Sequence, residues 1–364
     1  MGLYQLYENI FLYTVIFFTV IVASSLYRKS YCEIKAGSNN YFYALLIGIV
    51  FALWLGMRPP THDFADTGTY AQRFYIYKMG ANPSNTTDWL WAQFSYVCAQ
   101  KVDVSVFFTI VSICYFGVTL LACRVLVSNN TLVAYLFMLG SFSFFTYGVN
   151  GIRNGLACSI VLLAIAIMAN SRKNLLFAII LCFIAANIHR STMLPIASLF
   201  ASIYVVKKFQ WAYTFWVSSI LISLIAGDAV SEFFAGLGFD DRLSYIQDTT
   251  YKDSFSSIGF RWDFLIYSMM PIMLGYYIVI KRRIQNRSYL ILLNTYTIAN
   301  AFWVMLIRAS FSNRFAYLSW FMYPIVLAYP LMKLDIWGAE QGKKLIQIML
   351  AHIGFTWFMT SIYY

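Results

Sequence analysis

Arg153, His189 and Arg190 are the residues whose types and spacing most directly suggest chemistry. An apolar run of transmembrane length starts just after Arg153 and stops at residues 172–173, and a second run starts at Leu175 and ends at His189. If both runs cross the membrane, they form a hairpin whose two open ends lie at the same face. Arginine binds phosphate through a planar fork of donors, and histidine can act as a general base near neutral pH. The hairpin therefore predicts a site for a phosphate group and a proton.

Arg153 and His189 also have a structural interpretation. Gly151 and Gly155 flank Arg153, and they would let another backbone or a headgroup approach closely, but they also fit the helix-packing pattern GxxxG. Arg153 could then simply pair with a carboxylate, and a lone histidine is more often a satisfied polar residue. The expected meeting of Arg153 and His189 at one face favours a functional role. His352, in the middle of a late apolar run, is expected to be structural.

The elements that must position these residues are membrane spans. Hydrophobic residues make up 60% of the 364 residues and charged residues 11%, whereas soluble proteins have about 25% charged residues. We therefore predict an all-α polytopic integral membrane protein, with about 12 transmembrane helices in a single domain over residues 1–364. Besides the hairpin, the expected spans cover 9–27, 41–57, 104–126, 131–147, 191–206, 210–227, 262–280, 288–307, 315–332 and 345–361.

Two longer polar segments separate the spans, at about 58–103 and 228–261. The stretch 89–101 (WLWAQFSYVCAQK) is apolar but too short to cross a bilayer, so it is expected to form a re-entrant or interfacial helix. Both long segments fall on the same side of the membrane when the spans alternate. We therefore expect two periplasmic loops on the side of Arg153 and His189.

The charges of the alternating loops set this orientation. One set of loops holds 15 of the 26 Lys and Arg residues and the other holds 11, so the positive-inside rule places the first set in the cytoplasm. The net charge of +11 is then explained by orientation and anionic lipid, and no nucleic-acid partner is expected. Eight of the 11 outer cations are arginine, against six of 15 inside. Local pairing with carboxylates could explain any single outer arginine, but the whole set favours anion binding. The set includes Arg58, Arg190, Arg242, Arg308 and Arg314.

The first polar loop contains a second group of candidates. His62, Asp63, Asp66 and Tyr70 lie within nine residues of each other. A carboxylate there could act as a base or orient a sugar hydroxyl, and Tyr70 could stack on a sugar face or simply pack. A divalent metal is the weaker alternative because three ligands at this spacing are a weak signal, and no metal site is predicted.

The sequence has no P-loop, dinucleotide fingerprint, HExxH or GxSxG motif. Nothing therefore suggests a cytoplasmic domain that uses nucleotides. A phosphate met at the outer face is better explained by a lipid-linked donor than by a sugar nucleotide.

Several of these residues follow each other in an order that resembles a known family. Arg58 precedes an Asp-x-x-x-Tyr-x-x-x-Phe pattern that starts at Asp66, and an interfacial segment near Asp88 follows. Later come GIRNGLA at 151–157, IHRS at 188–191 and RASFSNRFAYLSWF at 308–321. Over about 50–330 this order resembles the EpsG-type, Wzy-like polysaccharide polymerases of bacterial envelopes. Asn154 stands where that family usually has Gln, and THDFAD replaces Gly-Thr-Asp, so the choice between Asp63 and Asp66 stays open.

The resemblance implies a membrane glycosyltransferase of the bacterial inner membrane with its active site on the periplasmic side. Such enzymes transfer a growing glycan from undecaprenyl diphosphate to the sugar end of another lipid-linked unit, as in O-antigen, capsule or exopolysaccharide synthesis. The implied partners are the lipid-linked oligosaccharide and membrane lipid, a chain-length regulator protein stays open, and no cofactor is implied. His189, Asp66 and Arg153 would be catalytic, with His189 the first choice of base, and the diphosphate or glycan would contact Arg58, Asp63, Tyr70, Arg190, Arg242, Arg308 and Arg314.

Two other functions compete with this one. A glycan ligase of the O-antigen-ligase type would share the arginine and histidine features. A flippase or transporter of lipid-linked oligosaccharide would instead carry polar or charged groups near the middle of several spans. The spans of this sequence are largely clean there, with His352 the main exception, and this favours chemistry at a membrane face.

Overall fold

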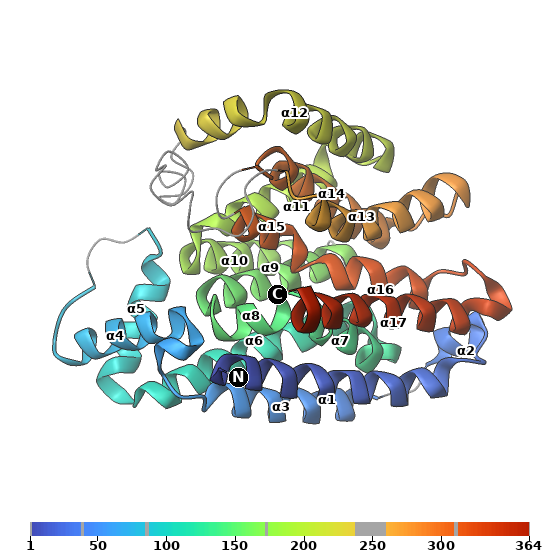
Figure 1. The fold of residues 1–364 in the computed structure, drawn as a ribbon. Coiled ribbons are helices and arrows are strands. Elements are labelled where there is room, and N and C mark those ends of the chain that lie inside the picture. Colours follow the sequence, from blue (N-terminus) through green and yellow to red (C-terminus); the bar gives the residue numbers. More distant parts are fainter. Residues whose placement is uncertain are drawn as a thin grey trace. The chain divides into compact units, whose positions relative to one another are not determined.

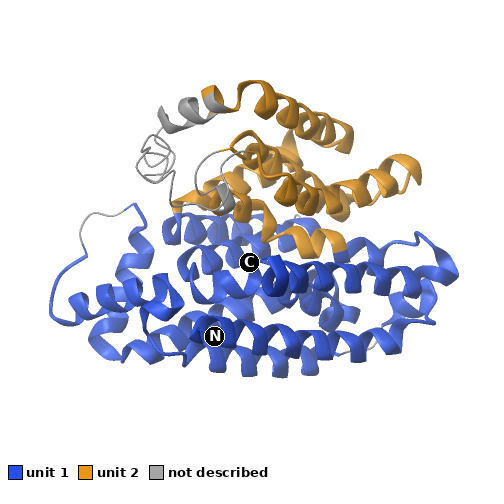
Figure 2. Cartoon of the chain, in the orientation of Figure 1, with its two compact units in different colours: residues 1–189, 328–364 blue, residues 190–327 orange. Residues whose placement is uncertain are grey.

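The computed structural model describes residues 2–37, 40–83, 87–171, 174–236, 260–308 and 312–363. These residues form helices and connecting turns, with no strand among them, which confirms the all-α prediction. The chain divides into two compact units, unit 1 with residues 1–189 and 328–364 and unit 2 with residues 190–327 (Figure 2). Most of the expected loop 228–261, with Arg242, lies outside the described residues.

The helices of unit 1 come from both ends of the sequence (Figure 1). They are α1 Leu3–Leu26, α2 Tyr31–Ala36, α3 Tyr41–Gly56, α4 Asp66–Lys78, α5 Trp89–Lys101, α6 Val104–Leu126, α7 Thr131–Leu139, α8 Phe144–Val149, α9 Ile152–Asn170, α10 Leu175–Ile188, most of α16 Tyr323–Lys333, and α17 Gln341–Phe358.

Unit 2 is built around one central helix. Its helices are α11 Met193–Tyr204, α12 Phe209–Gly236, α13 Trp262–Tyr276, α14 Arg287–Met305 and α15 Ser312–Trp320. Helix α14 packs against the other four.

Seven helical segments of the described chain are long and apolar enough to cross a membrane, and α3 and α10 are shorter apolar helices. A multi-pass membrane protein is therefore supported, although the expected count of about 12 spans is not reached. One of the expected spans that is not among them is α14, and its composition has a physical explanation. Its buried side chains include Asn294, Thr295, Thr297 and Asn300, and a helix covered by protein on all sides does not need an apolar surface.

The polar groups of α14 are held by its neighbours. Trp216 of α12 donates to the Asn300 Oδ1 at 2.8 Å, and Asn300 Nδ2 donates to Ser319 of α15 at 3.0 Å. The hydroxyls of Ser202 and Thr295 lie 2.9 Å apart. The interior of unit 2 is thus more polar than the sequence analysis expected, but these groups are uncharged and bonded to each other.

The expected span 131–147 is broken into α7 and α8. Gly140 ends α7, and its carbonyl accepts a bond of 2.8 Å from the hydroxyl of Thr356 in α17. One turn earlier on both helices, His352 Nε2 lies 2.9 Å from the Phe137 carbonyl. A helix can break inside an apolar region when neighbouring side chains bond the freed carbonyls. This contact confirms the structural role predicted for His352.

Chain segments gather at two ends of unit 1. At one end lie α4 and α5, the start of α1, the end of α3 and the turn between α8 and α9 (Figure 1). The Tyr4 hydroxyl of α1 lies 3.3 Å from that of Thr146 in α8, and Arg58, just after α3, donates to the Val149 carbonyl. We call this the α4–α5 end.

The opposite end collects the other connections. The amide of Gly342 donates to the Lys29 carbonyl at 2.9 Å, and the side chain of Asn130 donates to the Ile34 carbonyl at 2.7 Å. These contacts place the end of α3 and the α8–α9 turn at one end of unit 1, and the segments after α1 and before α7 at the other.

Candidate functional site

A cluster of three charged or ionisable side chains lies at the α4–α5 end. Arg153 Nη1 lies 2.6 Å from Asp88 Oδ2, and His189 Nδ1 lies 3.4 Å from the same oxygen. Asp88 and His189 are buried, with 9% and 5% of their side chains exposed, whereas 20% of the Arg153 side chain is exposed. The prediction that Arg153 and His189 come together is confirmed, and we call these three residues the Asp88 cluster.

Helix ends place the three side chains. Arg153 lies in the first turn of α9, His189 directly follows the last residue of α10, and Asp88 directly precedes α5. Helix α10 packs against both α9 and α5. The antiparallel α9–α10 pair therefore brings Arg153 and His189 to one end, and α5 brings the carboxylate that lies between them. The Oδ2 atom of Asp88 thus lies within 3.4 Å of both side chains.

Two glycines let the chain turn tightly before Arg153. A β-carbon on Gly151 would lie 2.7 Å from the Tyr147 ring, and one on Gly155 would meet the Tyr147 carbonyl oxygen. The GxxxG spacing therefore serves close packing of α9 on the turn from α8. This is the structural use of these glycines that the sequence left open.

We expect Gly155→Ala to lower the free energy of unfolding by about 1–3 kcal/mol, because a backbone carbonyl cannot rotate away as a side chain can. The loss should appear as a lower Tm in detergent. Gly117→Ala is the matched control, since a β-carbon on this glycine of α6 meets nothing within 4 Å. Equal Tm changes in the two variants would contradict the close contact.

Arg58 lies in a second, fully buried network at the same end. Its guanidinium donates to the Leu55 carbonyl at 2.8 Å, to the Val149 carbonyl at 2.8 Å and to the Thr67 hydroxyl at 3.0 Å. The Thr67 hydroxyl also donates to the Val149 carbonyl at 2.7 Å. The side chain lies over the ring of Phe108, 4.8 Å from its centroid. Arg58 thus ties the end of α3, the start of α4 and the turn before Arg153 together.

A side chain from that turn also holds the start of α4. Asn150 Oδ1 accepts a bond of 2.9 Å from the backbone amide of Asp66, the first residue of α4. The preceding residue, Ala65, has a φ of 48°, a conformation that is uncommon for a residue other than glycine. The helix α4 inside the expected loop 58–103 was not predicted, because its start depends on these distant partners.

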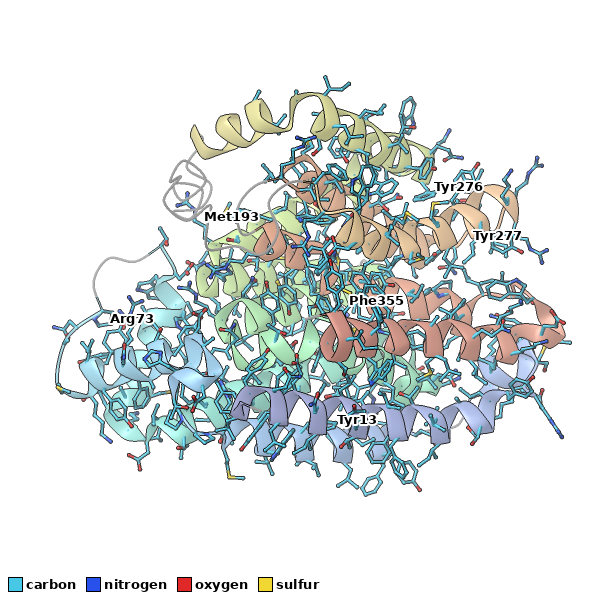
Figure 3. The ribbon with its side chains drawn as sticks, viewed as in Figure 1. Tyr13, Arg73, Met193, Tyr276, Tyr277 and Phe355 are labelled. Atoms are coloured by element: carbon cyan, nitrogen blue, oxygen red, sulfur yellow. The ribbon has the colours of Figure 1, made fainter. Side chains whose placement is uncertain are left out.

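The remaining candidates of the first polar loop lie on the surface of unit 1. Asp63 and Asp66 are exposed, and Tyr70 is half-buried with its ring 5.7 Å from that of Trp91. His62 Nε2 lies 2.9 Å from Gln72 Nε2. In the described part of the chain no three His, Cys, Asp or Glu side chains are close enough to hold a metal ion. Arg73, another residue of α4, is exposed at this end (Figure 3).

The other predicted arginines belong to unit 2. Arg190 is exposed at the start of a short helical turn that leads into α11, and Arg314 is half-buried on α15. Arg308 follows α14, and its guanidinium lies 3.5 Å from the Leu224 carbonyl in α12, next to the non-helical residue Ala226. Arg308 therefore contacts a carbonyl near the kink of α12. Their roles at a diphosphate stay predictions.

Asp88 is the member of the cluster that the sequence analysis did not select. It follows a polar segment and precedes an interfacial helix, where a single aspartate is ordinary as a helix-capping residue. One signal could have indicated an acidic partner for Arg153. A partly buried arginine at a membrane edge needs a negative charge nearby.

Comparison with known proteins identifies the family of the chain. Residues 41–364 match the EpsG family. No curated protein and no solved structure matches the chain. The matched region includes all three residues of the Asp88 cluster and reaches the end of the sequence. The chain therefore belongs to the EpsG family.

Proposed function

We propose that the protein is a polymerase of lipid-linked glycan repeat units, acting at the periplasmic face of the bacterial inner membrane. It transfers the growing glycan from undecaprenyl diphosphate to the sugar end of another lipid-linked unit. Membership of the EpsG family supports a role of the polysaccharide-polymerase type. The observation that carries the proposal is the convergence of Arg153 and His189 on Asp88 at one end of unit 1.

The two side chains match the two needs of such a transfer. The acceptor hydroxyl oxygen attacks the anomeric carbon of the donor, and the bond from that carbon to the diphosphate oxygen breaks with both electrons going to the oxygen. Arg153, whose side chain is 20% exposed, stabilises the negative charge of the leaving diphosphate. The hydroxyl proton passes to the imidazole of His189 as general base.

Asp66 remains the second candidate for the base, with Asp63 next. Both are exposed on the surface formed by α4 and the turn before it, where they can also orient sugar hydroxyls. His189 is preferred because it shares Asp88 with Arg153, so base and anion-binding group lie in one cluster.

The first experiment uses the purified protein in nanodiscs with lipid-diphosphate-linked repeat units, with and without EDTA. A glycan ladder that survives EDTA supports a polymerase that relies on its arginines, and a ladder lost with EDTA directs attention to Asp63 and Asp66. If a matched substrate gives no ladder, the polymerase proposal fails. Transfer of the glycan to a different lipid acceptor would then identify a ligase, and movement of lipid-linked glycan across a bilayer a flippase.

The interior of unit 2 does not favour the flippase alternative. The polar side chains of α14 are buried and uncharged and bond to neighbouring helices, as Asn300 does to Trp216 and Ser319. Charged and ionisable groups gather instead in the Asp88 cluster.

We expect His189→Ala to slow glycan transfer by about 100- to 10,000-fold, because the acceptor hydroxyl loses its base. Binding of the lipid-linked donor should change little, since the guanidinium of Arg153 is kept. Single-turnover rates and donor binding measured in parallel test this. His352→Ala is the matched control: it removes a buried imidazole that bonds to the Phe137 carbonyl, so it should lower Tm but keep the rate of the folded protein. Wild-type turnover in His189→Ala would remove His189 as the base.

A further inference from the structure

Helix α1 carries a group of hydrogen-bonding side chains in its first two turns. Tyr4, Gln5, Glu8 and Asn9 are all half-buried, and we call these four residues the α1 polar strip. Residues four apart lie on the same face of a helix, so Tyr4 lies beside Glu8 and Gln5 beside Asn9. Glu8 is the only charged residue of α1, a helix that is long and apolar enough to cross a membrane. A charged side chain in such a helix is a candidate for a functional role.

Glu8 lies on the face of α1 that packs against the rest of unit 1. It precedes the buried residues Leu12 and Val15 by four and seven positions, which is the spacing of one helix face. Leu6 and Ile10, two positions before and after Glu8, are exposed. The carboxylate therefore points away from the exposed apolar side of α1.

The start of α8 lies beside Glu8. Tyr4 and Phe11, on the turns before and after Glu8, both contact the Phe145 ring, with centroid distances of 5.5 and 5.4 Å. The Tyr4 hydroxyl also lies 3.3 Å from that of Thr146. These contacts place the α1 polar strip at the α4–α5 end of unit 1, where the Asp88 cluster also lies.

The strip has polar atoms that are accessible and unused. Within the described part of the chain, the Glu8 carboxylate forms no hydrogen bond and no ion pair, and its oxygens are not among the buried polar atoms that lack a partner. Gln5 Nε2 donates to Asn9 Oδ1 at 3.2 Å, which leaves the amide oxygen of Gln5 and the amide nitrogen of Asn9 for other partners. The strip therefore offers one carboxylate, one further acceptor and one donor to a ligand.

We propose that the α1 polar strip binds a sugar residue of the glycan, with the Glu8 carboxylate accepting hydrogen bonds from sugar hydroxyls. The inference rests on the proposed function, because it takes the lipid-linked glycan as the substrate. An ionised carboxylate has about four acceptor positions on two oxygens, so it can hold two neighbouring hydroxyls of one sugar ring. Hydrogen bonds to a charged acceptor are also stronger than bonds between neutral groups.

The negative charge of Glu8 selects the sugar among the parts of the substrate. The diphosphate is itself an anion and would be repelled by the carboxylate. The polyprenyl tail is apolar and cannot replace the water that hydrates a carboxylate. Sugar hydroxyls are uncharged donors, so they meet neither obstacle. Arg153 and Glu8 would then bind different parts of one substrate at the same end of unit 1.

The test measures the binding of two probes to the purified protein in nanodiscs. One probe is the repeat-unit oligosaccharide released from its lipid, which has no diphosphate, and the other is undecaprenyl diphosphate, which has no sugar. Glu8→Ala should weaken binding of the oligosaccharide by about 10- to 100-fold, as for the loss of a hydrogen bond to a charged group. Binding of undecaprenyl diphosphate should not change. Glu8→Gln should lie between wild type and Glu8→Ala, since an amide oxygen accepts more weakly than a carboxylate.

Asp103→Asn is the matched control for the loss of a carboxylate. Asp103 is exposed and pairs with Lys78 at 2.9 Å, outside the α1 polar strip, so this variant should bind both probes like the wild type. Equal binding of the oligosaccharide by wild type and Glu8→Ala would overturn the proposal. Loss of both probes together with a lower Tm would overturn it too and leave Glu8 a structural residue.

Monodeoxy versions of the oligosaccharide test the contact itself. The version that lacks the hydroxyl bonded to Glu8 should bind the wild type about as weakly as the full oligosaccharide binds Glu8→Ala. It should lose nothing further in that variant, because removing both partners of one bond is not additive. If every deoxy version loses as much affinity in Glu8→Ala as the full oligosaccharide does, Glu8 does not contact a sugar hydroxyl.

The polymerase assay separates this inference from the proposed function. In Glu8→Ala, KM for the lipid-linked unit should rise and kcat should change little, as for lost binding that is equal in the ground state and the transition state. If the wild type makes no glycan ladder but binds the oligosaccharide through Glu8, the polymerase proposal fails and the sugar site stands. A ladder from the wild type together with an unchanged KM in Glu8→Ala would reject the sugar site alone.

Discussion

Arg153→Lys is expected to lower the rate of glycan transfer by about 100- to 1,000-fold while the protein still folds, as for the loss of one preorganised donor at a developing anion. Lysine keeps the positive charge and can still pair with Asp88. It loses the planar fork, which lets arginine hold a carboxylate with one nitrogen and offer others to a phosphate. Because Arg153 Nη1 is already engaged by Asp88, the remaining donors are those available to the diphosphate.

The measurement compares single-turnover rates on lipid-diphosphate-linked repeat units and the Tm of each variant. Arg73→Lys is the matched control, since Arg73 is exposed on α4 at the same end of unit 1 (Figure 3). The control should transfer glycan like the wild type. Full activity of Arg153→Lys would exclude the fork of Arg153 from diphosphate recognition.

Arg58→Lys is expected to lower the free energy of unfolding by about 1–3 kcal/mol, the range for leaving a buried hydrogen-bonding group without its partner. A lysine ammonium cannot bond the Leu55 carbonyl, the Val149 carbonyl and the Thr67 hydroxyl in the geometry of the guanidinium. Burial lowers the pKa of Arg58 to about 10, so the side chain is still charged at neutral pH and the network is that of a cation.

Thermal unfolding in detergent tests this prediction. Arg124→Lys is the matched control, because Arg124 is exposed and stacks over the Tyr41 ring at 3.9 Å, a contact that lysine can also make. An unchanged Tm with a raised KM in Arg58→Lys would show that Arg58 binds substrate, as the outer arginines were expected to do. A lower Tm would show that it holds the turn before Arg153.

The parts of the site that follow from span length could be predicted from the sequence. Two apolar runs joined by a short polar turn must form an antiparallel pair, so Arg153 and His189 had to meet at one end. The helix 89–101 was also predictable, since its length and composition suit a short helix. The meeting of distant connections at both ends of unit 1 follows from the same alternation of spans.

The parts that depend on long-range polar contacts could not be predicted. Asp88 looks like an ordinary residue before a helix until α10 places His189 beside it. Arg58 looks like any outer arginine, but its donors are bonded to backbone and hydroxyl oxygens of three segments. The break after Gly140 lies in a run that is apolar on both sides, and it is supported by Thr356, which is 216 residues away in the sequence. The burial of α14 was not predictable either, because its polar side chains do not show in the sequence that other helices cover them.

The side chain of Asn150 at the start of α4 has a consequence for the biogenesis of the protein. Asp66 leaves the ribosome 84 residues before the asparagine that bonds to its amide, a delay of about 4–17 s at ordinary rates of translation. Val149, whose carbonyl accepts bonds from Thr67 and Arg58, arrives equally late. During this interval α3 and α6 can already be inserted in the membrane, but α4 between them still lacks its contacts with Val149 and Asn150. The surface beside the Asp88 cluster is therefore completed only after the α8–α9 turn has been synthesised, and a chain stalled before residue 150 leaves the start of α4 without these partners.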